Sequence, residues 1–374
     1  MLVDYLRSLI EIPSESGNES AVADYIEELL KDTAFEVVRD KDDNIFAFIN
    51  GRKPVLTLNG HIDTVPPVNW KESPYIARII DNKIYGLGSS DMKSGVAVML
   101  DIAQNYTGDL PLCLAFTVNE EHGTDKKEDG VRTFLKNYRT KYAITLEPSS
   151  DKNRVMIGIG CQGRIVADYS IKGRAVHSSI FERGDNAIYR ACDIVRRITQ
   201  EAELLEYHEV AENIFIKPSL SVTKISGGLK SNIVPDQCNI TVDRRISPDE
   251  RIEDVENQLK KFGSYKISNF RPPFIARPYS YLLKVAERVY RQMLGYVVKF
   301  CFRGWVDAAY FHQAGAEAIN IGPGTVGVGH SADEFCYIKN LYKVASILNT
   351  IITELEQGDE PEDEEAIVAV RTRN

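Results

Sequence analysis

The chain has 374 residues, with 45 basic and 54 acidic side chains and a formal net charge of −9. This length predicts two domains, and a composition close to the globular average excludes a collagen-like chain, a disulfide miniprotein and a wholly disordered chain. The acidic balance argues against nucleic acid as a partner, because it supplies no broad basic field. The longest apolar stretches are far below the ~20 residues of a membrane span, and the start of the chain is not a signal peptide. We therefore expect a cytoplasmic protein without a membrane partner.

The first part of the chain alternates between strand-like and helical patterns. Two helical stretches lie within residues 1–31. Strands are then predicted at 35–38, 44–49, 55–58, 112–118 and 142–146, and helices at 94–104 and near 130–138. This alternation is typical of an α/β layer. The near-continuous apolar run LCLAFTV predicts a strand that is covered on both faces, as in a mostly parallel sheet.

A different order of elements begins after about residue 163. The patterns predict, in order, a strand over RIVADYSIKG, a helix at 186–200, strands at 219–226 and 238–246, a helix at 250–262 and a strand at 264–270. This β-α-β-β-α-β order matches a ferredoxin-like α+β domain.

From about residue 278 the α/β pattern returns, with helices at 281–294 and 340–357 and a strand at 316–322. The simplest arrangement is a small domain inserted into a discontinuous larger one. We predict a first domain of residues 1–163 and 278–357, an inserted domain of residues 164–277, and an acidic, mobile tail of residues 358–374.

Five segments bring metal-capable side chains to the ends of predicted strands or to the start of a helix. In chain order they carry His61 with Asp63, Asp91, Glu120 with Glu121, Glu147, and His330. In an open α/β sheet, sites form outside the carboxyl ends of the strands. Four of the segments meet that condition, and Asp91 instead precedes a helix. Each segment alone is a weak signal, but the five together predict one site.

The residue types in these segments suit two divalent metal ions. An aspartate two residues after His61 can accept the second imidazole N–H, which makes the other ring nitrogen a better metal donor. Two histidines with three carboxylates could hold a pair of ions with one carboxylate bridging. Zinc suits such a mixed nitrogen and oxygen set, and cobalt or manganese could replace it.

The adjacent pair Glu120 and Glu121 is informative for the chemistry. Neighbouring residues cannot easily bind the same ion, so one glutamate can be a ligand while the other serves as a general base towards water. A dinucleotide site is a weaker hypothesis: GIGCQG at 158–163 fits GxGxxG, but it precedes a strand-like run and not a helix.

These motifs, in this order, resemble those of the M20 metallopeptidase family over residues from about 5 to 350. The resemblance implies that His61 and Glu147 bind one ion, that Glu121 and His330 bind the other, and that Asp91 bridges them. It also implies that Glu120 is the general base and that Asp63 orients His61. The family's inserted lid domain is similar to the β-α-β-β-α-β unit, and in many members it mediates dimerisation, which implies a homodimer.

Local motifs of the inserted domain also resemble the family. GRAVHSS implies that His177 polarises the scissile carbonyl, often from the partner subunit. SNIVP implies that Asn232 binds polar groups of the substrate, and DRR implies that Arg245 binds its carboxylate, with Arg244 as the alternative register. An arginine suits a carboxylate because its fork can form two parallel hydrogen bonds.

The resemblance implies a metal-dependent amidohydrolase that cleaves an N-acyl amide bond in a small molecule. Glu rather than Asp at position 147 resembles the desuccinylase and aminoacylase branch more than the branch that cleaves peptides. The runs IGCQGR and INIGPG are most similar to desuccinylases, which act on N-succinyl-LL-2,6-diaminopimelate. A deacetylase of N-acetyl-ornithine or N-acetyl-lysine, an aminoacylase and a dipeptidase are the alternatives. A protein that uses the same fold only for binding is an alternative of another class.

Overall fold

The computed structural model describes residues 1–121 and 127–358. The chain divides into two compact units. Unit 1 comprises residues 1–155, 277–298 and the chain from 321 onward, and unit 2 comprises residues 156–276 and 299–320. Unit 2 therefore includes residues 156–163 and 299–320, which the sequence analysis assigned to the first domain; the predicted domain limits stay a prediction. Residues 359–374 of the predicted mobile tail lie outside the described residues.

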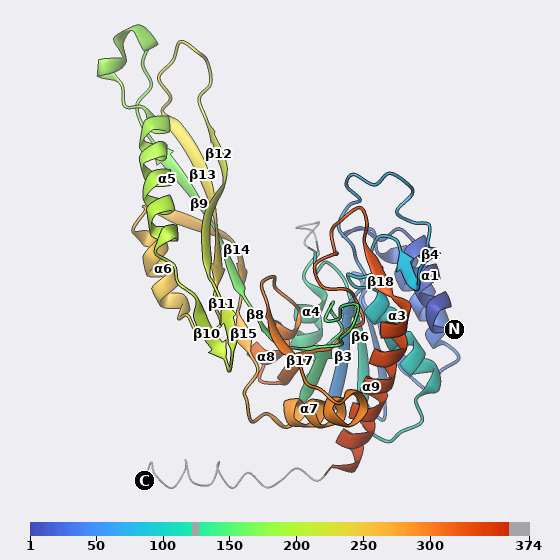
Figure 1. The fold of residues 1–374 in the computed structure, drawn as a ribbon. Coiled ribbons are helices and arrows are strands. Elements are labelled where there is room, and N and C mark those ends of the chain that lie inside the picture. Colours follow the sequence, from blue (N-terminus) through green and yellow to red (C-terminus); the bar gives the residue numbers. More distant parts are fainter. Residues whose placement is uncertain (122–126, 359–374) are drawn as a thin grey trace, which may run out of the picture. The chain divides into compact units, whose positions relative to one another are not determined.

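Unit 1 contains a sheet whose strands follow the order β1 (Glu36–Arg39), β2 (Ile45–Ile49), β6 (Leu112–Thr117), β3 (Leu56–His61) and β7 (Tyr142–Thr145). Figure 1 labels β6 and β3 of this sheet. β3 is parallel to both β6 and β7, whereas β1, β2 and β6 pair antiparallel. Every residue of β3, β6 and β7 is buried, which explains their continuous apolar runs. The predicted α/β fold is confirmed, with parallel strands at the centre of this mixed sheet.

Helices and a small second sheet complete unit 1. The helices are α1 (Leu2–Glu11), α2 (Ser20–Leu30), α3 (Lys93–Asn105), α4 (Gly130–Asn137), α7 (Tyr281–Leu294) and α9 (Ile338–Gln357). α3 is buried along most of its length and packs on α1, α9 and β3. The small antiparallel sheet has the order β18 (Phe335–Tyr337), β5 (Lys83–Tyr85) and β4 (Arg78–Ile80), which sequence patterns did not reveal.

Unit 2 contains the predicted β-α-β-β-α-β arrangement. Its elements are β9 (Gly163–Lys172), α5 (Ala187–Glu203), β12 (Ser219–Gly227), β13 (Gln237–Ile246), α6 (Ile252–Lys260) and β14 (Tyr265–Arg271). The sheet order is β12-β13-β9-β14, and all three pairs are antiparallel. One face of this sheet forms a hydrophobic core with α5 and α6 (Figure 1). Alternating burial along β9 and β13 leaves the other face polar.

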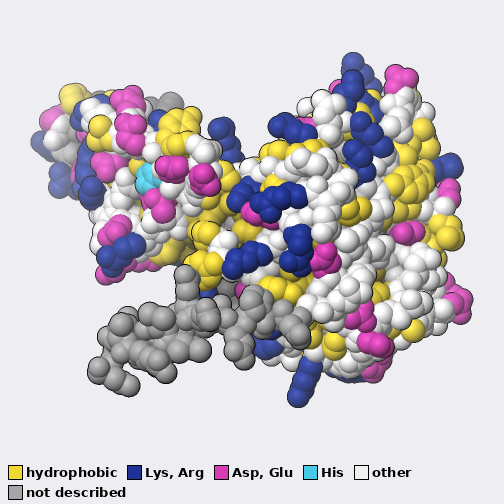
Figure 2. All heavy atoms as spheres, turned by 60° about the horizontal axis from the view of Figure 1, so that its bottom comes forward, with side chains coloured by type: hydrophobic (Ala, Val, Ile, Leu, Met, Phe, Trp, Pro, Cys, Tyr) yellow, Lys and Arg dark blue, Asp and Glu magenta, His cyan; other side chains and the backbone are white. Residues whose placement is uncertain are grey.

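Further short elements belong to unit 2. They are β8 (Ile157–Cys161), the 3-10 helix Ser178–Arg183, β10 (His208–Ala211), β11 (Ile214–Ile216), β15 (Phe274–Ile275), β16 (Lys299–Phe302), α8 (Ala308–Gln313) and β17 (Glu317–Asn320). The GxGxxG segment lies in β8 and the first residue of β9, without the helix that a dinucleotide site requires. Among the described residues, no helix is both long and apolar enough to cross a membrane. Figure 2 shows basic, acidic and apolar side chains interspersed on the visible face.

Candidate metal centre

The topology of unit 1 brings the predicted metal ligands to one edge of its sheet. His61 is the last residue of β3, while Glu120 and Glu121 follow β6 and Glu147 follows β7. Because these three strands are parallel, their carboxyl ends lie at the same edge. Asp91 comes two residues before α3, and the peptide bond that follows it is cis. His330 lies in the segment before β18.

Distances between side-chain atoms divide the ligands into two sets that share Asp91. The Nε2 atom of His61 lies 3.2 Å from Oδ1 of Asp91 and 3.5 Å from Oε1 of Glu147. The Nε2 atom of His330 lies 3.4 Å from Oδ2 of Asp91 and 2.8 Å from Oε1 of Glu121. Asp91 thus directs one carboxylate oxygen to each histidine, which is the arrangement that a bridging carboxylate requires.

The donor set fits a pair of divalent cations. Ligand atoms of His61, Asp91 and Glu121 all lie within 4.8 Å of one another, as do those of His61, Glu120 and Glu147. Two imidazole nitrogens with several carboxylate oxygens suit zinc, cobalt or manganese better than magnesium or calcium, which favour oxygen alone. The second group shows that Glu120 reaches the same space as the predicted ligands.

The electrostatics of the cluster also favour cations. The hydrogen bond between His330 and Glu121 raises the pKa of His330 to about 9. Burial raises the pKa of the Glu121 carboxyl, and the neighbouring Asp91 charge adds to this effect. Burial opposes a charge on His61, but Glu147, Asp63 and Asp91 together raise its pKa well above the usual value. Crowded carboxylates attract positive charge, and divalent ions would supply it in place of protons.

Asp63 organises two of the segments that carry these ligands. Nδ1 of His61 lies 2.9 Å from the backbone carbonyl oxygen of Asp63 and 3.5 Å from its Oδ1, so the carbonyl is the nearer acceptor for an Nδ1–H. Nε2 is directed at the cluster, and once a cation displaces the ring's second proton, an Nδ1–H held by this carbonyl leaves Nε2 as the metal donor. The Asp63 carboxylate accepts hydrogen bonds from the backbone N–H groups of Glu120 and Glu121 and from the Ser16 hydroxyl. Burial opposes ionisation of Asp63, yet its hydrogen bonds to His61 and these donors lower its pKa.

The other predicted site residues lie in unit 2. His177 precedes the 3-10 helix and its Nδ1 accepts the backbone N–H of Ser179. The Ser178 N–H donates to the carbonyl of Asn232, so the segments of His177 and Asn232 are neighbours. Arg245 is on the polar face of the sheet, where its Nε lies 3.0 Å from Oδ1 of Asp243.

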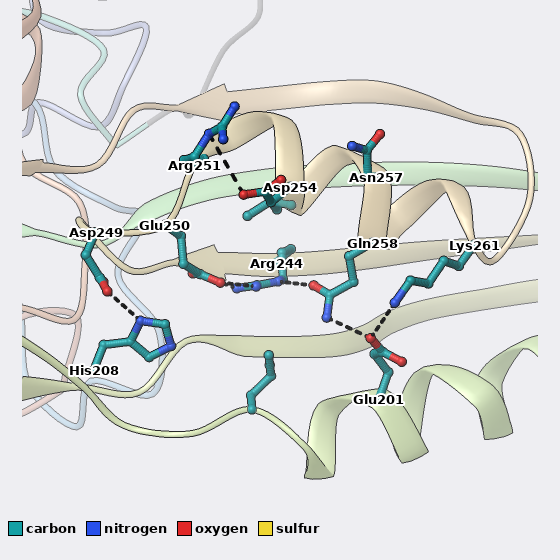
Figure 3. A pocket seen from close by; sticks show the side chains of 12 residues that line it. Glu201, His208, Arg244, Asp249, Glu250, Arg251, Asp254, Asn257, Gln258 and Lys261 are labelled. Carbon is teal, nitrogen blue, oxygen red and sulfur yellow. Dashed lines mark hydrogen bonds and ion pairs between the residues drawn. The ribbon is translucent and has the colours of Figure 1, made fainter.

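Arg244 takes a different position, and this distinguishes the two arginine registers. Its side chain is 1% exposed and points to the helix-covered face of the sheet. It donates to Gln258 at 2.9 Å and forms an ion pair with Glu250. Figure 3 shows Arg244 between these two partners, with Gln258 donating in turn to Glu201. These side chains line a pocket of about 450 Å³. The lining residues of this pocket include Arg244 but not Arg245.

Two buried charged residues near the cluster were missed by the sequence analysis. The Glu334 carboxylate accepts backbone N–H groups of the segment that carries Asp91. The Lys93 ammonium donates to the backbone carbonyls of Leu9 and Ile12, and burial lowers its pKa to about 7. The only signal in the sequence is their closeness to predicted ligands, since Glu334 follows His330 by four residues and Lys93 follows Asp91 by two.

Comparison with known proteins shows the family to which the chain is similar. The model of peptidase family M20/M25/M40 matches residues 57–354. Succinyl-diaminopimelate desuccinylase of Corynebacterium glutamicum is 27% identical, over 92% of this chain and 94% of that protein. Acetylornithine deacetylase of Klebsiella pneumoniae is 28% identical, over 94% and 96%.

A solved structure has the same fold. A dinuclear metal-binding peptidase of the M20 family from Bacillus subtilis superposes with a TM-score of 0.72, at 16% identity, over 96% of this chain and 98% of that one. The alternative of a protein that only binds its ligand is set aside, because the matched family and its curated relatives are hydrolases. The chain belongs to peptidase family M20/M25/M40, and it is a hydrolytic enzyme.

Proposed function

We propose that the protein hydrolyses an N-acyl amide bond with the help of two divalent ions, and that N-succinyl-LL-2,6-diaminopimelate is its substrate. The observation that carries the proposal is the placement of Asp91, with one oxygen towards His61 and the other towards His330. The desuccinylases among its relatives support this substrate, and the acetylornithine deacetylase supports an N-acetyl amino acid as the alternative. An aminoacylase or dipeptidase activity would use the same site.

In this proposal the side chains of unit 1 hold both ions. His61 and Glu147 would hold one ion and Glu121 and His330 the other, with Asp91 shared between them, since these side chains approach one another in those groups. Zinc is the first candidate, with cobalt or manganese as replacements. When bound, two such ions polarise an amide carbonyl and make water a stronger acid near neutral pH.

Glu120 is the general base of the proposed reaction. Asp63 holds the backbone N–H groups of Glu120 and Glu121, which positions both carboxylates at the end of β6. Glu120 takes a proton from the water that attacks the amide carbonyl, and then gives this proton to the leaving amine. His177 stabilises the developing oxyanion, while Asn232 and Arg245 hold polar groups and the carboxylate of the substrate.

We further propose that the protein is a cytoplasmic homodimer that associates through its inserted domain. β12 is an edge strand of the unit 2 sheet and exposes Ile225, which is 53% accessible. An exposed edge strand can pair with a second copy. Size-exclusion chromatography with light scattering tests this, because a monomeric mass at micromolar concentration would contradict it.

The substrate is tested by amine release from a panel of compounds with zinc-loaded or cobalt-loaded protein. The panel holds succinyl-diaminopimelate, N-acetyl-ornithine, N-acetyl-lysine, N-acetyl-methionine and several dipeptides. We expect the succinylated compound to have the highest kcat/KM. A higher value for an acetylated compound or a dipeptide would retain the mechanism but reject the substrate.

A further inference from the structure

In residues 86–91, the segment that carries Asp91, every backbone N–H group has an acceptor. The N–H groups of Leu87 and Ser89 donate to the carbonyls of Pro74 and Gly86. The remaining N–H groups, those of Gly86, Gly88, Ser90 and Asp91, all donate to one residue, Glu334. The side chain and the backbone carbonyl of Glu334 therefore accept most of the backbone N–H groups of the segment that presents the predicted bridging carboxylate.

The carboxylate of Glu334 forms three of these four hydrogen bonds. Its Oε1 lies 2.8 Å from the nitrogen of Ser90 and 2.9 Å from that of Asp91, and its Oε2 lies 3.1 Å from that of Gly88. The carbonyl oxygen of Glu334 accepts from Gly86 at 3.2 Å. Burial raises the pKa of Glu334 to about 7, whereas the three N–H donors favour the ionised carboxylate, with which they form charge-assisted bonds.

A role in filling space does not explain a glutamate at this position. Glu334 is 1% exposed, and burial of an ionised carboxylate is costly unless donors surround it. A leucine or methionine would fill a similar volume without that cost, but it would leave three buried N–H groups without an acceptor. The segment also has little freedom, since a Cβ on Gly88, which has a φ of +77°, would lie 2.9 Å from side-chain carbons of both Lys93 and Thr64.

Glu334 also connects two ligand segments that are far apart in the sequence. It follows His330 by four residues, and it holds the N–H of Asp91, which is 243 positions away. In the cluster, the side chains of His330 and Asp91 approach each other to 3.4 Å. The same residue thus belongs to one ligand segment and anchors the other.

We propose that Glu334 is a positioning residue that sets the orientation of the Asp91 carboxylate relative to His330. This inference rests on the proposed metal site, and it adds a residue that binds no ion itself. Supporting residues behind metal ligands change metal affinity by 10- to 100-fold when they are altered. Loss of the Glu334 carboxylate should therefore weaken the binding of the ion that Asp91 and His330 share, without unfolding unit 1.

The test compares Glu334→Gln with the unaltered protein. Glutamine keeps the volume and one acceptor oxygen, but its NH2 group faces backbone N–H groups. Zinc affinity is measured by competition with a chromophoric chelator, and the cobalt-loaded proteins are compared by visible absorption. We expect one of two ions to bind 10- to 100-fold more weakly and the cobalt spectrum to change. Glu334→Asp, which keeps the charge, should recover part of the affinity and serves as the second variant if glutamine prevents folding.

Ser280→Ala is the matched control for stability. Ser280 is a buried cap of α7 in unit 1, and it accepts the Leu283 N–H away from the cluster. This control should lower the melting temperature and leave metal affinity and spectrum unchanged. Unchanged affinity and spectrum in Glu334→Gln would overturn this inference but would leave the proposed metal site standing. If the unaltered protein itself binds no ion, the proposed metal site fails and the inference fails with it.

Discussion

At Glu120 and Glu121, two neighbouring carboxylates take different partners. Glu121 lies 2.8 Å from His330, whereas Glu120 groups with His61 and Glu147. Asp63 accepts the backbone N–H groups of both. The pair therefore allows one side chain to bind an ion while the other transfers a proton, which is a division that a single glutamate could not provide.

Glu120→Gln should separate these roles. The amide cannot take a proton from water, so we expect kcat to fall by about 10²- to 10⁴-fold. Metal content should stay near that of the unaltered protein, because the amide removes none of the five proposed ligands. Turnover and metal analysis of the same preparations measure both effects. The control is Glu128→Gln, seven residues after Glu121. It removes a carboxylate that forms ion pairs with Arg132 and Lys136. Near-normal turnover in Glu120→Gln would contradict the assignment.

Arg244 and Arg245 make a second contrast between neighbours. Arg244→Met should destabilise the protein by about 3 kcal/mol, because it removes the positive charge that pairs with the half-buried Glu250 and leaves this carboxylate with the Ser247 N–H. Arg245→Met should hardly change stability but should raise KM about 10- to 100-fold, as expected for loss of a charge-assisted bond worth about 1.5–3 kcal/mol. Denaturant melts and steady-state kinetics on both variants check this. A KM effect confined to Arg244→Met would reverse the assignment.

At the scale of elements, α3 approaches the end of β7 closely, and this predicts whether Gly95→Ala raises or lowers stability. Gly95→Ala in an exposed helix would stabilise by about 1 kcal/mol. Here a Cβ on Gly95 would lie 2.6 Å from the carbonyl oxygen of Leu146 and 2.8 Å from its Cβ, directly before Glu147. We expect a loss of about 1–3 kcal/mol instead. Thermal melts should show this loss, while Ser346→Ala at an exposed position of α9 reports the propensity effect alone. A raised melting temperature in Gly95→Ala would show that α3 can shift.

Sequence patterns predicted the long elements and the residues at strand ends for a physical reason. Buried parallel strands produce continuous apolar runs, and the residues that follow them meet at one edge of the sheet. Short strands such as β5 and β10 left no such pattern, and the glycines of β8 concealed its strand character. Glu334 was missed because its bonds to backbone N–H groups depend on tertiary packing and not on periodicity.

The face of the sheet to which each of the two arginines points could have been predicted from the sequence. Cys238, Ile240, Val242 and Ile246 alternate along β13, and a strand has a period of two residues. Position 244 therefore points inward with this apolar set, and position 245 points outward. The sequence analysis assigned Arg245 and kept Arg244 as the alternative because the DRR motif match did not fix the register, although only position 244 continues the apolar alternation.

At the scale of the whole molecule, the proposed ligands extend from His61 to His330, and unit 2 interrupts the chain between them. The proposed metal centre needs His330, so it can be complete only when the part of the chain beyond unit 2 has joined unit 1. The ions would then act as a connection between early and late segments. Their removal should therefore loosen unit 1 in particular, and unit 2 supplies an internal control.

Chelation of the ions should lower stability in unit 1 and leave exchange in unit 2 unchanged. Ions that bind only the folded state at 100 times their Kd contribute about 2.7 kcal/mol, which corresponds to about 5–10 °C in Tm for a unit of this size. Hydrogen exchange with mass spectrometry should show faster exchange in the segments around His61, Asp91, Glu121 and His330. Peptides from β9 and β13 should be unaffected, since none of their residues is a proposed ligand. Re-addition of zinc should restore both properties. Equal acceleration in both units would mean that chelation destabilises the chain as a whole, and no acceleration would reject the metal centre.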